Sequence, residues 1–287
     1  MYSADKNNSK AASPMYQPSY GNASLSPHKA SSALFLCGFF LVSLVTEVSA
    51  QNLFEQGKQF YEQRAEGAEG FQADPQPINS SIDALEKALH NDIEPEKSAS
   101  YLLRAYYFKA MFTGLSEDKQ QAIYEKGREL GEKMEKRFPK SVPIKFWYSA
   151  NLGRWADVHG FIKAATSGIA KKLRRITKEI IDLNPRYEGG GGYRILAQVH
   201  FHTPKIPLLM GWPSDKKAKK LVAKAMEVNP NHPTNRMLYA QLLLEFDQTD
   251  KAEEHIRYIL NSEIRDSHII EDRYLKYRCR KLLKEHF

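Results

Sequence analysis

Proline residues divide this sequence at almost constant intervals. The intervals are 44, 46 and 45 residues long, and the prolines are Pro95, Pro139, Pro185 and Pro230. Apolar residues at helical spacing lie before and after each proline, such as Ile176 and Ile180 before Pro185 and Leu196 after it. Because proline lacks a backbone N–H and does not continue a helix, each of these prolines is predicted to end one helix and to precede another. Each unit is therefore a helix, a turn and a second helix.

The second helix of each unit has an aromatic residue or leucine followed by alanine. In one unit these residues are Phe146, Trp147 and Ala150. Alanine allows close helix crossing, and the aromatic rings fill the space beside it. No alternating apolar pattern of any length predicts a β-strand. We therefore predict an all-α protein of stacked antiparallel helical hairpins. Such an α-solenoid resembles tetratricopeptide repeats (TPRs), with a unit longer than the roughly 34 residues of a standard TPR.

The N-terminal part of the chain predicts export. Residues 1–32 are rich in Ser, Asn, Pro and Lys, and are expected to be disordered or to precede the true start. Residues 33–50 combine an apolar run with a small-x-small end, so a signal peptide cleaved after Ala50 is predicted. The alternative is an uncleaved inner-membrane anchor, although the run is shorter than the roughly 18 to 20 residues that span a bilayer. We expect an exported protein without a stable membrane span, in which residues 51–287 form one repeat domain.

Charge content narrows the class of partner, and cysteine content bears on how the domain is stabilised. The chain has 42 Lys and Arg against 34 Asp and Glu, a net charge of +8, and much of the excess lies between Gly160 and Met226. Such an excess attracts acidic proteins, anionic lipid or nucleic acid, but an exported protein rarely meets nucleic acid. We interpret these charges as solvated outer helix faces, with a partner surface as the alternative. Cys279 is the only cysteine after Ala50, so packed apolar surface must stabilise the domain.

Four consecutive glycines, Gly189 to Gly192, separate two helical patterns at the third proline turn. In one interpretation, glycine lets adjacent helices touch, and Arg194 pairs with Glu188 or Asp182. In the other, the helix start exposes backbone N–H groups, and Arg194 adds a forked donor that suits the carboxylate of an organic acid. The residues of this hypothetical ligand site are Gly190, Gly191, Gly192, Tyr193 and Arg194.

A proline-rich segment follows between Val199 and Pro213, and it cannot be one continuous helix. It is too apolar for an ordinary exposed loop. Its large apolar residues should pack back onto the solenoid, which we favour, or line a pocket or partner surface: Ile206, Leu208, Leu209, Met210 and Trp212.

The basic terminal helix is predicted to run from Ile264 to His286. Its apolar residues are Tyr274, Tyr277, Leu282 and Leu283. Because a terminal repeat must cover its neighbour, we expect this helix to cap the solenoid rather than to contact a membrane surface.

The sequence predicts no catalytic, metal or cofactor site. His200 and His202 are two residues apart, so they diverge on a helix and make a weak metal pair. Cys279 has no identifiable base beside it, and the glycine run lacks the preceding strand of a nucleotide-binding loop. We therefore expect a protein that is not an enzyme and has no cofactor.

Three stretches together resemble the T component of tripartite ATP-independent periplasmic (TRAP) transporters. They are the glycine entry Glu188–Ala197, the loop ending in Gly211, Trp212 and Pro213, and the helix and turn from Lys217 to Asn235. The resemblance implies a periplasmic protein of cryptic TPRs that forms homotrimers with apolar pores. It also implies binding to the transporter's substrate-binding protein. In that role we expect the chain to receive a small organic ligand, apolar or a carboxylate, from the binding protein. The alternative is an exported TPR scaffold that binds another protein in the cell envelope.

Overall fold

The computed structural model describes residues 53–160, 163, 167–203 and 213–287, which belong to one compact unit, Val45–Phe287. The predicted disordered region 1–32, the signal region 33–50 with Ala50, and the apolar residues Ile206, Leu208, Leu209, Met210 and Trp212 all lie outside the described residues. Among the described residues no helix has both the length and the apolar character that a membrane span requires.

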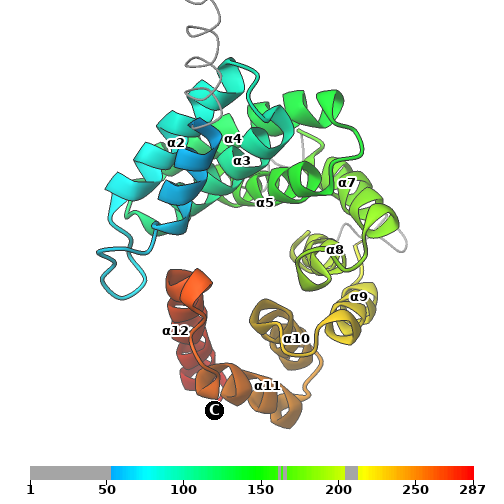
Figure 1. Cartoon of the computed structure of the whole chain (residues 1–287). Helices are drawn as coiled ribbons and strands as arrows, with labels where there is room; N and C mark the ends of the chain where they lie inside the picture. Colours follow the sequence, from blue (N-terminus) through cyan, green and yellow to red (C-terminus); the bar gives the residue numbers. More distant parts are fainter. Residues whose placement is uncertain (1–52, 161–162, 164–166, 204–212) are drawn as a thin grey trace, which may run out of the picture. The chain divides into compact units, whose positions relative to one another are not determined.

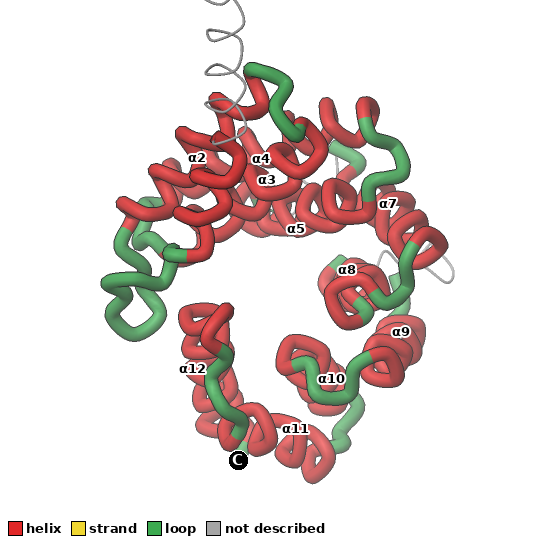
Figure 2. The backbone as a smooth tube through the Cα atoms, viewed as in Figure 1, coloured by secondary structure: helices red, strands yellow, loops and turns green. Residues whose placement is uncertain are grey.

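The described chain is helical, as predicted, and Figure 2 shows helices joined by short turns. After helical residues 53–62, the α-helices are α2 (Pro75–His90), α3 (Pro95–Phe112), α4 (Glu117–Arg137), α5 (Val142–His159), α7 (Ile169–Leu183), α8 (Gly191–His202), α9 (Asp215–Val228), α10 (Pro233–Glu245), α11 (Thr249–Asn261) and α12 (Ile269–His286). Two short 3₁₀ helices are η1 (Tyr187–Gly189) and η2 (Asp266–His268). The described residues contain no strand, and the one isolated β-bridge among them joins Glu69 and Gln72.

The helices pack as consecutive antiparallel neighbours in two rows. We call α3, α5, α8, α10 and α12 the A row, because each contacts the next one along the row as well as its sequence neighbours. The other helices, α2, α4, α7, α9 and α11, form the B row. Figure 1 shows α8 and α10 on the inner side of α9 and α11. The all-α solenoid predicted from the proline interval is therefore confirmed.

The prolines mark the turns in two different ways. Pro139, Pro185 and Pro230 each lie two residues after the last residue of α4, α7 and α9. Pro95 instead is the first residue of α3, and α2 has already ended at His90. Proline suits the first position of a helix because the N–H there has no acceptor within the helix. The prediction that Pro95 ends a helix is therefore wrong, although it does mark a turn.

The last helix contacts both ends of the repeat stack. It begins at Ile269, after η2, rather than at the predicted Ile264. It packs on α10 and α11, where its Leu282 and Leu283 join an apolar cluster. Its Tyr274 ring also lies 5.5 Å from Phe71 and 5.8 Å from Phe112, near the start of the described chain. The helix therefore covers the last repeat, as expected, and also contacts the first.

Candidate functional site

The four glycines lie where α8 approaches three other helices. Gly189 and Gly190 have left-handed backbones, with φ of 61° and 86°, which glycine adopts at little cost. A Cβ at Gly190 would lie 3.0 Å from the Cα of Ala225, and one at Gly191 would lie 2.4 Å from the Phe146 ring. A Cβ at Gly192 would lie 2.9 Å from Ile180. The run therefore permits close contact of α8 with α9, α5 and α7.

Arg194 lies in the interior beside this run and is only 6% exposed. Its Nη1 donates to the backbone oxygen of Glu188 at 3.2 Å and to Oδ1 of Asn235 at 2.7 Å. The expected ion pair with the side chain of Glu188 or Asp182 is therefore not what the structure contains, because the guanidinium meets neutral oxygens. Burial lowers the pKa of Arg194 to about 10.

Asn235 is wholly buried and completes this contact. Its amide donates to the carbonyls of Gly189 and Ala225, both at 2.9 Å. Arg194, Asn235 and the glycine turn thus form one network that links η1 and α8 to α9 and α10. Tyr193, the remaining residue of the predicted site, is half-buried on the same helix, with the Lys224 ammonium 5.8 Å from its ring centroid.

Glu188 has an unusual backbone for a residue other than glycine. Its φ is 48° and its ψ is 42°, in the left-handed region that costs most side chains free energy. Its carboxylate favours the charged forms of Arg104, Arg194 and Arg265, three residues that belong to different parts of the chain. We call Arg104, Glu188, Arg194, His232 and Arg265 the inner cluster.

Arg104 belongs to α3 and packs against aromatic rings beside the other residues of the inner cluster. Its guanidinium carbon lies 4.8 Å from the Tyr61 ring centroid and 5.1 Å from that of Trp147. The rings of Trp147 and Phe146 are 5.2 Å apart, and those of Phe146 and Tyr187 are 5.4 Å apart. Among the described residues, the buried Nε of Arg104 has no acceptor. A buried donor in this state is available to an anionic ligand.

The pKa of Arg104 reflects these surroundings. Burial alone would lower it, but the Tyr61 hydroxyl and the Glu188 carboxylate outweigh burial, and the pKa lies above its ordinary value. His232 behaves differently, because burial and then the charge of Arg194 lower its pKa to about 3. The inner cluster therefore holds charged guanidinium groups beside a neutral imidazole. Arg265 is already paired, with hydrogen bonds of 2.9 and 2.6 Å to Asp272.

Sequence reasoning selected Arg194 but missed Arg104. The available signal was that Arg104 follows Tyr101 by three residues, which puts both on one face of a helix. Tyr148 and Trp155 are buried in the largest apolar cluster, and Trp147 packs against it.

The remaining candidate residues do not assemble a reactive site. Burial is the main cause that lowers the pKa of His200 to about 4, and its Nδ1 accepts a hydrogen bond from the backbone of Ser214 at 3.3 Å. The described ranges contain no group of three His, Cys, Asp or Glu that could hold a metal ion. Cys279 is buried 3.7 Å from the sulfur of Met237, and burial raises its pKa to about 11.

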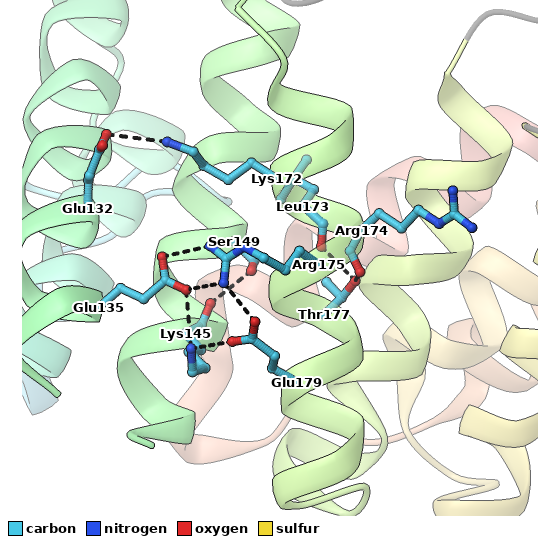
Figure 3. Close-up of polar contacts among 10 residues, drawn as sticks. All are labelled: Glu132, Glu135, Lys145, Ser149, Lys172, Leu173, Arg174, Arg175, Thr177 and Glu179. Carbon is cyan, nitrogen blue, oxygen red and sulfur yellow. Dashed lines mark hydrogen bonds and ion pairs between the residues drawn. The ribbon is translucent and has the colours of Figure 1, made fainter. Parts of the chain in front are cut away.

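Some basic residues form ion pairs between repeats, and Arg175 of the central basic region is one of them. The side chain of Lys145 is 2% exposed and lies 3.1 Å from Glu135 of α4 and 2.5 Å from Glu179 of α7. Arg175 pairs with the same two carboxylates at 2.8 and 2.7 Å. Figure 3 shows these four side chains together, with Lys172 reaching Glu132 nearby. We call Glu135, Lys145, Arg175 and Glu179 the interhelical charge network.

Comparisons with known proteins identify a similar fold but show no family. No family model matches the sequence, and no curated protein matches it. The yeast Tom70 structure aligns with 89% of this chain and 45% of its own, at 13% identity and a TM-score of 0.46. The TPR protein TTC0263 of Thermus thermophilus aligns over 82% of this chain and 99% of its own, at 17% identity and a TM-score of 0.56. The chain is therefore similar in fold to a TPR protein.

Proposed function

We propose that this chain is a non-catalytic scaffold that binds another protein through its A row, as the T component of a TRAP-type transporter. In this role it is exported to the periplasm by the signal peptide, assembles as a homotrimer and binds the substrate-binding protein. The inner cluster receives a small organic acid from that partner. TPR-like stacks offer such a role because the inner sides of stacked helices form extended binding surfaces.

One observation carries this proposal. Two of the stretches that resemble the T component, Glu188–Ala197 and Asn229–Asn235, are far apart in sequence but pack against each other. Arg194 of the first bonds to Asn235 of the second, and a Cβ on Gly189 would lie 2.7 Å from the ring of His232. Residues that carry the resemblance thus form one contiguous site beside Arg104, which supports a shared role for them.

Native mass spectrometry of the chain from Gln51 onward tests the proposal. The protein would be measured alone and with a substrate-binding protein encoded beside it in the genome. We expect a trimer, a complex with that protein, and an organic acid whose retention weakens in Arg104→Met. Arg257→Met is the matched control, because Arg257 is exposed on the B-row helix α11. A monomer that binds no substrate-binding protein would favour a general envelope scaffold instead.

A further inference from the structure

A second surface lies on the C-terminal helix and shares no residue with the inner cluster. A pocket of about 240 Å³ forms where residues 70–71 meet α12. The side chains that line it are Phe71, Ile264, Arg273, Lys276, Tyr277 and Arg280. This surface, which we call the terminal pocket, combines two chemical features.

The first feature is an exposed apolar lining. Phe71, Ile264 and Tyr277 are 38%, 39% and 47% exposed, which is high for large apolar side chains in a packed domain. The rings of Phe71 and Tyr277 lie 5.0 Å apart, so their exposed parts are adjacent. Adjacent exposed apolar side chains around a hollow are typical of a binding surface.

The second feature is uncompensated positive charge around that lining. Arg273 donates to the carbonyl of Gly70 at 3.1 Å, and Lys276 donates to the carbonyls of Leu260 and Ser262 at 3.0 and 2.5 Å. These acceptors are neutral, and in the described part of the chain neither residue, nor Arg280, forms an ion pair. Helical spacing puts Arg273, Tyr277 and Arg280 on one stripe of α12. Glu263, the acidic residue next to Ile264 in sequence, is exposed.

We propose that the terminal pocket binds an acidic segment of a partner protein, with one apolar side chain of that segment inside the pocket. The cations attract and orient the acidic residues, while burial of the apolar side chain supplies the anchor. A hollow of this size suits one discrete side chain, whereas a flat membrane surface would use the basic stripe without the pocket. This interaction is separate from the proposed transporter role, since it involves neither the inner cluster nor an organic acid.

Fluorescence anisotropy with a labelled acidic peptide tests the proposal. The peptide carries one central phenylalanine flanked by glutamates, and it is compared with a peptide that has alanine in place of phenylalanine and with one that has glutamines in place of glutamates. We expect the first peptide to bind and both changes to weaken it. Arg280→Glu should weaken binding by about tenfold or more, because it removes an attraction and adds a repulsion.

Lys281→Glu is the matched control. It makes the same charge change on the neighbouring residue, whose side chain is 64% exposed and outside the pocket. Because Arg280 is exposed as well, neither variant should unfold the protein. Equal weakening by both variants would reduce the effect to general charge attraction and overturn the proposal. Absence of peptide binding together with sedimentation on vesicles that contain phosphatidylglycerol would overturn it in favour of a membrane surface.

Discussion

Arg194 and Asn235 join the first turns of α8 and α10 through a 2.7 Å hydrogen bond. Both residues are almost completely buried, and Asn235 uses its amide on two backbone carbonyls at the same time. The contact therefore orients the guanidinium of the inner cluster and also holds two successive repeats together. Its two roles can be separated by measurement.

Asn235→Ala should lower the free energy of unfolding by about 1 to 3 kcal/mol, because it removes one hydrogen bond from the buried guanidinium and those that the amide gives to backbone carbonyls. Arg194→Met should destabilise the protein as well, and the double variant should lose less than the sum of the two effects. Urea unfolding followed by circular dichroism measures this coupling. Asn231→Ala, at an exposed position of the same turn, should change stability by less than about 0.5 kcal/mol. Additive losses would show that the two residues act independently.

A further variant, Arg194→Lys, distinguishes helix packing from ligand binding by Arg194. If the guanidinium also serves a ligand, Arg194→Lys should keep most of the stability but lose organic-acid binding, since lysine lacks the forked donor. Isothermal titration with benzoate, with benzamide as the uncharged comparison, measures this. Unchanged benzoate binding by a folded Arg194→Lys protein would limit Arg194 to helix packing.

Gly190→Ala should destabilise the protein by about 2 kcal/mol or more, since alanine is strained at a φ of 86° and its methyl would press on the backbone of Ala225. Gly153→Ala is the matched control. Gly153 lies inside α5, and a Cβ there would meet nothing within 4 Å, so alanine should stabilise the helix by about 0.5 to 1 kcal/mol. Thermal unfolding compares the two. Equal effects at both positions would contradict a packing role for the glycine run.

The repeat architecture could be predicted because its signals are local. Apolar residues at helical spacing and turns near Pro139, Pro185 and Pro230 depend on residues within one or two helices. Pro95 was misinterpreted because proline occurs both just after helices and at their first position, and spacing alone does not distinguish the two. The position of a helix start therefore needs the turn geometry that only the structure provides.

The residues that contact one another within the sites could not be predicted from such local signals. Arg194 was selected from its place after the glycines, but its acceptor, Asn235, is 41 residues further along the chain. Arg104 joins the inner cluster only because α3, α5 and η1 come together. Lys145 lies in an apolar helix and gave no signal, since its carboxylates belong to α4 and α7. Contacts between repeats depend on packing angles that a helical period does not contain.

The interhelical charge network predicts a loss of stability in acid. Burial alone would raise the pKa values of Glu135 and Glu179, but hydrogen bonds from Arg175 and Lys145 outweigh it and hold both below their ordinary value of 4.5. A carboxyl group with a lowered folded pKa contributes stability that is complete above its unfolded pKa and is lost as pH falls through the folded pKa. Unfolding free energy should therefore fall between about pH 5 and about pH 3.

Lys145→Met tests the same network from the cationic side. It should reduce the dependence of unfolding free energy on acid pH, because Glu135 and Glu179 lose a shared partner. Lys172→Met is the control, since it removes a half-exposed lysine that pairs with Glu132 outside this network. Urea titrations across the acid range provide the comparison. An unchanged pH profile in Lys145→Met would mean that other carboxyl groups cause the acid sensitivity.

Cys279 should be unreactive while the protein is folded. Its thiol is buried against Met237, and burial raises its pKa to about 11, so the reactive thiolate is scarce at neutral pH. In the chain from Gln51 onward it is the only cysteine, and its reaction with a disulfide reagent therefore reports on opening of the α10–α12 contact. We expect slow labelling in buffer and rapid labelling in urea. Leu275→Ala removes a neighbouring apolar contact in the same cluster and should speed the labelling in buffer. Labelling that is already rapid in the folded wild type would show that α12 does not stay packed on α10.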